Sequence, residues 1–374
     1  MCTEETRGNF QAEPDRRRSL IGGGASTAAL ALIGPAGRAE AMLGRIFDWL
    51  NSRPVESPLP GESILDFSAR VLPEITPTGK FYVQSIGWTP TGGTRVDWKI
   101  SVGGSVNSPF ELIASDLTAL PQREAWAAIT CIGNPVGGGQ IGNALWRGVP
   151  LRALLERASP RESALRSPAW RAVFRAADGY HDSIPLEAAL DERTLLCHRM
   201  NGAPLPPDHG APLRLLTPGV YGLKNVKWIR STEVAAGGHA GYWQGRGWSD
   251  AARVETLSRF EAPRRRVTVG APSAWLVGSA FAGDRGISRV EVAYGLGPKR
   301  HPWAPALVKK PLGSLAWTPW AFRMEFPEDG FYPATVRAVD GAGQLQTEKI
   351  SDPKPGGATG LMELNLYATG LPAM

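Results

Sequence analysis

The chain has 374 residues, of which 43% are hydrophobic and 20% are charged, with 13 tryptophans and 32 prolines. This length predicts about two or three domains, and this composition predicts a packed, loop-rich globular protein with more β structure than helical bundle. The formal net charge of +6 is mild, and the basic clusters Arg16–Arg18 and Arg264–Arg266 contain no interleaved aromatic residues. We interpret both as solvated surface and expect no nucleic-acid partner.

The N-terminal residues combine paired arginines with a weakly apolar run. RRSLI at 17–21 opens this run, and the small, polar segment GRAEA follows at 37–41. The pattern predicts a twin-arginine export signal over 1–41, and hence a periplasmic or other extracytoplasmic location. A disordered basic tail is one alternative. An uncleaved membrane anchor is another, although the apolar run 20–33 is shorter than the roughly 20 residues that a spanning helix needs.

The next part of the chain divides by composition. Residues 42–80 are rich in proline and serine and are interpreted as a linker and N-terminal arm, whereas 81–262 mixes short strand patterns with a few helices. Residues 96–104 alternate as a strand does, and 148–158 predict a helix that starts at Pro150. The apolar face of that helix contains Leu151, Leu154, Leu155 and Ala158.

After residue 262 the character of the sequence changes. Short runs such as ISRVEVAYG and FYPATVRAVDGAG alternate with period two and are separated by glycine and proline turns. This spacing is typical of an immunoglobulin-like β-sandwich. We therefore expect a separate domain over residues 263–374.

The three cysteines, Cys2, Cys131 and Cys197, cannot form a complete disulfide framework. The sequence contains no CxxC or HExxH pattern of a zinc site, no CxxCH pattern of covalent haem and no GxSxG pattern of a serine hydrolase. Cys197 has no glycine-rich context and is interpreted as a small core residue. Cys131 differs, because it stands directly before a glycine-rich loop.

Glycines 137, 139 and 142 in this loop match the GxGxxG dinucleotide fingerprint. That fingerprint requires a strand before the glycines and a helix that opens on the last one. Here Pro135 intervenes and the next helix is delayed to about residue 150, so a bound phosphate would face a loop. The glycines instead indicate that a large, rigid partner approaches the Cys131 backbone closely.

Three further stretches carry polar residues suited to such a partner: 79–85 with Tyr82, 174–186 with Asp178, and 200–229 with His209, Arg214, Asn225 and Lys227. Arginine and lysine bind phosphate, while Asp, Asn and His can recognise the amide and amino edges of a heterocycle. Individually, each has an ordinary interpretation, such as a turn histidine or a surface lysine. Together with Cys131 they suggest a cradle for a phosphorylated pterin whose metal is ligated by thiolate.

Over about residues 70–365 the sequence resembles the sulfite oxidase family of molybdopterin-dependent oxidoreductases, in its bacterial exported branch. TCIGNPVGGGQIGNALWRGVPLRALL resembles the family's cysteine segment, and DHGAPLRLLTPGVYGLKNVKW resembles its pterin-phosphate segment. GYWQGRGWSD follows at the expected place, and the tail resembles the family's immunoglobulin-like dimerisation domain. The resemblance implies an α+β fold: a mixed α/β molybdopterin-binding domain over 81–262, then an immunoglobulin-like β-sandwich.

The resemblance also implies roles for particular residues. Cys131 would ligate one molybdenum ion per chain, for which a soft thiolate is suited. Arg246 and Trp248 are candidates for the substrate funnel, where catalysis occurs. The residues expected to hold the molybdopterin are Tyr82, Asp178, His209, Arg214, Asn225, Val226 and Lys227. The implied chemistry is two-electron oxygen-atom transfer, the cofactor supplying the redox chemistry and the protein the binding and orientation.

The sequence departs from sulfite-oxidising members at the substrate site. Gln84, Ser85 and Ile86 stand where those members have an arginine, an asparagine and a histidine, and Gly247 and Trp248 replace a tyrosine segment. With fewer cations, the site has less attraction for a dianion such as sulfite. The substrate remains open among a small oxyanion, an S-oxide and an N-oxide.

The reaction and the partners also stay open at this stage. One alternative is a reductase of S-oxides or N-oxides, such as oxidised methionine, and another is a non-catalytic binding protein on the same fold. Because the chain has no haem motif, electrons must pass to a separate carrier such as a cytochrome. The resemblance implies a homodimer.

Overall fold

The computed structural model describes residues 57–90, 97–264, 266–299 and 301–371. The expected export signal, residues 1–41, lies outside these ranges. Within them, no helix combines the length and apolar character needed to cross a membrane.

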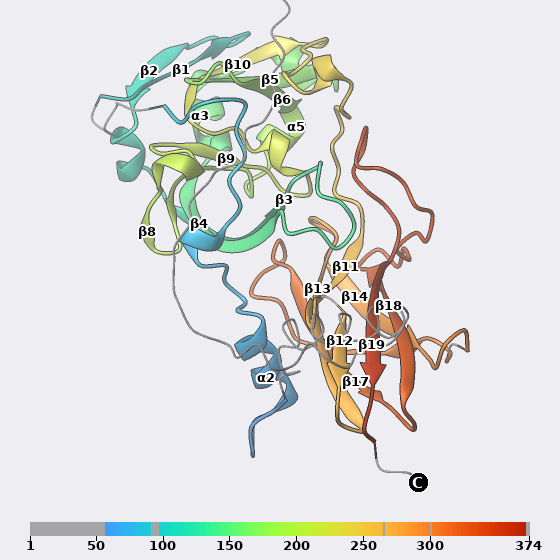
Figure 1. Ribbon diagram of the computed structural model, residues 1–374. Coiled ribbons are helices and arrows are strands. Elements are labelled where there is room, and N and C mark those ends of the chain that lie inside the picture. The colour runs from blue at the N-terminus through green and yellow to red at the C-terminus, as the bar shows by residue number, and fades with distance from the viewer. Residues whose placement is uncertain (1–56, 91–96, 265, 300, 372–374) are drawn as a thin grey trace, which may run out of the picture. The chain divides into compact units, whose positions relative to one another are not determined.

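The first sheet has the strand order β2-β1-β10-β5-β6 (Figure 1). Its strands are β1 (Lys99–Gly104), β2 (Phe110–Ile113), β5 (Trp170–Ala176), β6 (His181–Pro185) and β10 (Ile229–Ala236). β1 and β10 are parallel, whereas the other neighbours are antiparallel. Side chains alternate between the two faces, so Ile100, Val102 and Val234 are buried together in one core.

Helix α3 (Leu151–Ala158) packs into the same core and occupies the predicted place. Pro150 precedes it, and its four predicted apolar residues are all buried. The remaining helices between the strands are short: η2 (Asp116–Ala119), α4 (Glu162–Leu165), α5 (Leu186–Ala189), η3 (Pro207–His209), η4 (Gly222–Lys224) and η5 (Gln244–Arg246). The described chain is therefore rich in strands and poor in helix.

The second sheet positions Cys131. Its strands are β3 (Arg123–Thr130), β4 (Ile141–Pro150), β7 (Leu195–Met200), β8 (Ala203–Pro204) and β9 (Arg214–Leu216), with β9 paired to β7. β3 and β4 are antiparallel with Thr130 opposite Ile141, so residues 131–140 form the loop between them. Gly142 already belongs to β4. A strand therefore follows the glycines, and the dinucleotide geometry, which needs a helix there, is excluded.

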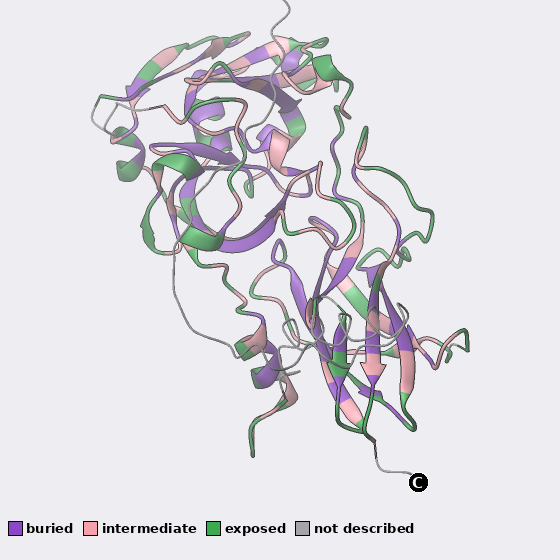
Figure 2. Ribbon diagram, viewed as in Figure 1, coloured by how far each residue is buried: buried purple, intermediate pink, exposed green. Residues whose placement is uncertain are grey.

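Two further sheets form the C-terminal part. One has the order β11-β13-β17-β16 and the other β12-β19-β18-β14-β15. Their strands are β11 (Leu257–Ala262), β12 (Val267–Val269), β13 (Ser273–Phe281), β14 (Ile287–Tyr294), β15 (Ala304–Pro305), β16 (Leu307–Val308), β17 (Thr318–Glu325), β18 (Gly330–Asp340) and β19 (Met362–Ala368). Side chains of both sheets, among them Trp320, Val336 and Leu366, share one core. Figure 2 shows buried residues along the strands and exposed ones in the connecting loops.

Two details differ from the sequence-based division of the chain. β11 pairs with β13, so the C-terminal sheets begin at Leu257 rather than at residue 263. The stretch interpreted as a linker and N-terminal arm contains helix α2 (Ile64–Val71) and the turn η1 (Thr78–Lys80). Ser63 caps α2 by accepting a hydrogen bond from the Asp66 amide at 3.1 Å. Phe67 anchors it, buried against Trp275 of β13.

Candidate active site

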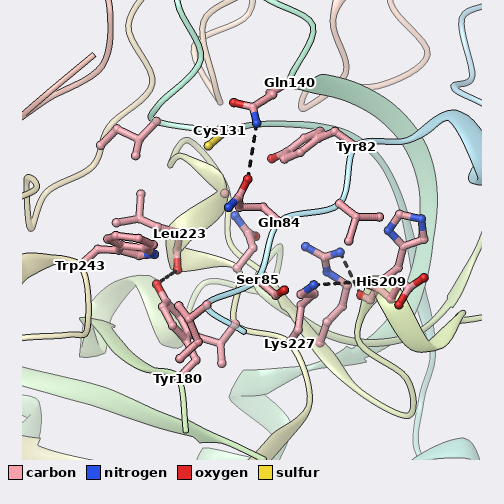
Figure 3. A pocket seen from close by; sticks show the side chains of 18 of the residues that line it. Tyr82, Gln84, Ser85, Cys131, Gln140, Tyr180, His209, Leu223, Lys227 and Trp243 are labelled. Carbon is pink, nitrogen blue, oxygen red and sulfur yellow. Dashed lines mark hydrogen bonds between the residues drawn. The ribbon is translucent and has the colours of Figure 1, made fainter. Parts of the chain in front are cut away.

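A cavity of about 250 Å³ lies beside the 131–140 loop and the segments 81–86 and 207–228 (Figure 3). It brings together most of the residues that the sequence singled out. Those lining it are Tyr82, Cys131, Asp178, His209, Arg214, Asn225, Val226, Lys227 and Trp248. Gln84, Ser85 and Ile86 line it as well.

Arg246 does not line the cavity, contrary to the expectation for the substrate funnel. Its guanidinium stacks 3.6 Å from the centre of the Tyr242 ring and donates to the Tyr242 carbonyl at 2.8 Å. Gly247 follows with φ +84°, so the chain turns between Arg246 and Trp248. Residues only two apart in sequence therefore have different surroundings, and Trp248 alone reaches the cavity.

The loop at the Cys131 end is fixed by its own backbone and one side chain. The Cys131 amide donates to the Gln140 carbonyl at 2.9 Å, and the Gln140 amide donates to Asn134 Oδ1 at 3.0 Å. A Cβ on Gly138 would lie 2.2 Å from that same Asn134 oxygen, which explains the glycine. A Cβ on Gly133 would be 3.7 Å from Cys131 Sγ and 3.8 Å from the Trp248 ring. The sulfur and the indole thus lie close together at this end.

Cys131 is a free cysteine and is partly buried. Burial raises the pKa of its thiol, while a hydrogen bond from the Gly133 backbone amide acts in the opposite direction. Across the cavity, Gln140 Nε2 donates to Gln84 Oε1 at 3.4 Å (Figure 3). Near the sulfur, the wall is therefore formed by neutral amides, apolar groups and the Tyr82 phenol.

The other end of the cavity contains a buried arginine. Arg214, on β9, is 6% exposed; its Nη1 donates to the His209 carbonyl at 3.0 Å, and its guanidinium lies 4.7 Å from the centre of the Trp146 ring. Its Nε has no hydrogen-bond partner among the described residues. Burial lowers the pKa of Arg214 to about 10. A buried cation of this kind is costly without a counter-ion.

Lys227 lies beside Arg214 and adds a second positive charge. Its Nζ donates to the Asp208 carbonyl at 2.8 Å. Burial, and then repulsion by Arg214, lower the pKa of Lys227 to about 8. Among the described residues neither cation forms an ion pair with a carboxylate, although the charges of Asp178 and Asp208, which also line the cavity, act to raise the pKa of Lys227. Burial also lowers the pKa of His209, and the lowered pKa favours a neutral ring. The Nε2 of His209 donates to the Thr78 carbonyl at 3.1 Å.

Tyr82, Asp178 and Asn225 also line the cavity. Burial raises the pKa of both Tyr82 and Asp178. A Cβ on Gly222 would be 2.7 Å from the Tyr82 hydroxyl, so this glycine makes room for the ring. The Asn225 amide is already engaged, because its Oδ1 accepts from the Thr217 amide at 2.8 Å and its Nδ2 donates to the Tyr221 carbonyl at 3.3 Å. Asn225 thus shapes the loop that carries Lys227.

Residues 87–243 match the oxidoreductase molybdopterin binding domain. The oxidoreductase YuiH of Bacillus subtilis is 32% identical over 183 residues, which cover 49% of this chain and 88% of that protein. Mitochondrial sulfite oxidase of Drosophila melanogaster is 28% identical over 324 residues, which cover 74% of this chain. The chain belongs to the sulfite oxidase family of molybdopterin-dependent oxidoreductases.

Two further findings qualify this membership. The solved structure of the sulfane dehydrogenase SoxCD from Paracoccus pantotrophus matches with a TM-score of 0.66 at 22% identity, over 91% of this chain and 92% of that one, and so shows the same fold. The chain spans 56% of the Drosophila sulfite oxidase and 53% of the rat enzyme, about half of each. The likeness to those enzymes is therefore partial.

As a member of this family the protein is a molybdopterin-dependent oxidoreductase, and its cofactor is molybdenum-molybdopterin. The cavity fits that group. The partly buried Cys131 thiol would be a soft ligand for the metal, and Arg214 and Lys227, which form no ion pair with a carboxylate among the described residues, would bind a pterin phosphate. The orphaned Nε of Arg214 is a donor placed for such an anion.

Some lining residues were missed by sequence reasoning. Gln140, Tyr180, Leu223 and Trp243 all line the cavity. Trp243 was visible in the GYWQGRGWSD segment, where two tryptophans flank a glycine turn. Gln140 lies in the glycine loop itself, but only the β3–β4 pairing shows that its side chain faces Gln84.

Proposed function

We propose that the protein catalyses a two-electron oxygen-atom transfer on a small sulfur or nitrogen compound bound at the Cys131 end of the cavity. This proposal depends on one observation: the cavity has a free thiol at one end and, at the other, two cations that form no ion pair with a carboxylate among the described residues. When bound, the molybdenum cofactor supplies the two-electron change and the oxygen-atom exchange.

The chain's own residues have three tasks in this proposal. Cys131 ligates the metal, and Arg214 with Lys227 binds the phosphate end of the pterin. The indoles of Trp243 and Trp248 cover the substrate and exclude water, their rings lying 6.4 Å apart in an edge-on contact. Gln84 and Gln140 present amide N–H groups that can donate to an oxygen of the substrate.

The charge of the cavity wall favours a neutral substrate over sulfite. Among the described residues that line the cavity, the cations are Arg214, Lys227 and any protonated His209, all grouped at one end (Figure 3). The residues at the other end that could meet a substrate are Gln84, Gln140, Trp243 and Trp248. A dianion there would lose its hydration without gaining a charge-assisted bond. This favours the second candidate, reduction of S-oxides or N-oxides, over oxidation of sulfite.

Steady-state assays on the full-length, molybdenum-loaded protein test both directions. Sulfite with ferricyanide as acceptor tests oxidation; dimethyl sulfoxide, methionine sulfoxide and trimethylamine N-oxide with a reduced viologen dye test reduction. We expect turnover of at least one neutral oxide and weak or absent sulfite oxidation. A low-micromolar Michaelis constant for sulfite would contradict the substrate argument. Absence of molybdenum from the purified protein would instead support the non-catalytic binding protein.

The proposal extends to the protein's surroundings. Export by the paired Arg17 and Arg18 is supported by the sequence alone, and electrons would pass to a separate carrier such as a cytochrome. A homodimer through the C-terminal sheets is supported by the edge strand β16, where Leu307 is 52% and Val308 39% exposed. Sedimentation of the full-length protein at micromolar concentration tests the dimer, and fractionation of cells carrying lysine at both arginine positions tests export.

A further inference from the structure

Lys224 stands among cavity-lining residues, but its side chain does not enter the cavity. It ends η4, between Leu223 and Asn225, and is only 2% exposed. Its ammonium donates to Asp182 Oδ1 at 2.8 Å, to the Ser183 carbonyl at 2.9 Å and to Asp250 Oδ1 at 3.0 Å. All three of its protons therefore have acceptors, and the proposed function uses none of them.

The first acceptor, Asp182 on β6, is 1% exposed and connects Lys224 to the start of the 241–250 segment. Asp182 Oδ2 accepts from Gln244 Nε2 at 3.3 Å, and the Tyr180 hydroxyl, also 3.3 Å away, donates to the Leu223 carbonyl at 2.8 Å. A Cβ on Gly241 would be 2.6 Å from Asp182 Oδ1, so only glycine lets the chain pass this carboxylate. The 241–250 segment is thus held at its beginning by a carboxylate that Lys224 neutralises.

The second acceptor, Asp250, holds the end of the same segment. It is bound by Lys224 and also by Arg171 Nη2 at 3.0 Å. Arg171 in turn donates to the Ser183 hydroxyl at 2.7 Å. Two cations and two carboxylates therefore form a charge-balanced cluster. Replacing Lys224 by an uncharged residue would leave Asp182 buried without its cation, which is the costly case for a buried pair.

Between these two anchors lie Trp243 and Trp248, the two indoles of the cavity wall. Their rings contact each other, and Trp248 also approaches Gly133 beside the Cys131 sulfur. One buried ammonium therefore fixes both ends of the segment that covers the substrate end of the cavity. We propose that Lys224 is a positioning residue that holds the 241–250 segment, and with it the indole wall, over the Cys131 end. The consequence for substrate binding rests on the proposed function; the anchoring of the segment does not.

Limited trypsin digestion of the full-length, cofactor-loaded protein tests the anchoring without any assay of turnover. Arg246 lies inside the segment and is an available trypsin site if the segment opens. Arg166, with a side chain 76% exposed on another element, serves as the reference site in the same digest. Lys224→Met should raise cleavage after Arg246 relative to Arg166 by about tenfold or more, because cleavage follows the open population. Lys309→Met, which breaks the Lys309–Glu74 pair elsewhere, should leave the ratio unchanged.

A second variant keeps the test decisive if Lys224→Met does not fold. Asp250→Asn releases only the half-exposed end of the segment and should give a smaller rise in the same ratio. An unchanged Arg246-to-Arg166 ratio in every variant that folds overturns the proposal.

Kinetics add the functional readout, using whichever of sulfite and dimethyl sulfoxide the unmodified protein turns over. Lys224→Met should raise KM more than it lowers kcat, with molybdenum and pterin content at the unmodified level. If Lys224→Met has the same KM as the unmodified protein and a full cofactor content, Lys224 has no role in positioning the indole wall for substrate. If the unmodified protein turns over none of sulfite, dimethyl sulfoxide, methionine sulfoxide and trimethylamine N-oxide, the proposed function fails while the proteolysis result still stands.

Discussion

The two ends of the cavity are built differently. At the Cys131 end, a ten-residue loop rich in glycine is held by Asn134, and the nearby side chains Gln84 and Gln140 are neutral. At the other end, Arg214 and Lys227 extend from strand β9 and the segment after η4, and burial lowers the pKa of both. In the proposed function, metal ligation and anion binding thus belong to separate structural elements. Substitutions at one end should therefore leave the task of the other largely intact.

The largest expected effect is at the sulfur. Cys131→Ser should reduce turnover to the level of a protein-free control, because an alcohol is a far harder ligand than a thiolate. The fold, followed by circular dichroism, should be unchanged. Cys197→Ala is the matched control, since Cys197 is fully buried in β7 and does not itself line the cavity. Full activity in the Cys131→Ser protein would reject the ligand assignment.

At the opposite end, Arg214→Met should separate cofactor retention from stability. Losing one charge-assisted hydrogen bond costs about 1.5–3 kcal/mol, or roughly 10- to 150-fold in affinity for the pterin phosphate. The cofactor-free protein should nevertheless melt at a higher temperature, because a buried cation without a counter-ion is removed. Pterin content and thermal melts measure the two effects. Arg230→Met, which removes a cation stacked on Trp98, is the control. Unchanged pterin retention in Arg214→Met would refute the phosphate-binding role of Arg214.

Gln84→Arg tests whether a positive charge added at the neutral end of the cavity improves binding of sulfite. If the new guanidinium reaches the substrate, KM for sulfite should fall by about tenfold, the lower end of what one charge-assisted bond contributes. Gln84→Met removes the amide without adding charge and should not lower KM. Equal KM values in both variants would place Gln84 outside the substrate's reach.

The smallest expected effect concerns Lys227 and pH. Its pKa is about 8 in the folded protein, below the ordinary 10.5, so the unfolded chain binds more protons between these values. The free energy of unfolding of the cofactor-free protein should therefore be lowered by the full penalty below pH 8. This penalty should shrink as the pH rises toward 10.5. The measurement is a series of thermal melts of the unmodified protein and of Lys227→Met between pH 8 and 10.5. The higher melting temperature expected of the variant should approach that of the unmodified protein over this range. An advantage independent of pH would argue against a half-buried ammonium that lowers stability.

Residues whose chemistry is unusual for their sequence context could be predicted. Cys131 before a glycine-rich loop, and Arg214 and Lys227 close to glycines and prolines, carry local signals that do not depend on tertiary contacts. Helix α3 was predictable for the same reason, since its apolar spacing and Pro150 lie within one short stretch. Each of these features is encoded over a few neighbouring residues.

Features that depend on distant partners could not be predicted. Arg246 and Trp248 belong to one segment, but the chain turns at Gly247 between them. Arg246 is exposed to solvent, whereas Trp248 lines the cavity. β11 was assigned to the first domain because period-two alternation does not reveal which sheet a strand joins. The role of Lys224 is likewise invisible in sequence, because its acceptors Asp182 and Asp250 lie 42 and 26 residues away.

The Cys131 loop contacts the C-terminal sheets, and these contacts limit which loops and which C-terminal strands can be combined in one protein. Gly137 has φ +70°, and a Cβ there would lie 2.8 Å from the sulfur of Met362 on β19. Its neighbour Gly138 accepts a hydrogen bond from Arg259 of β11 through its carbonyl. A chimaera that joins this loop to the C-terminal strands of a distant relative would separate both pairs at once. Positions 137 and 362 are therefore expected to vary together among related enzymes, whereas Arg259 requires only a backbone carbonyl at position 138.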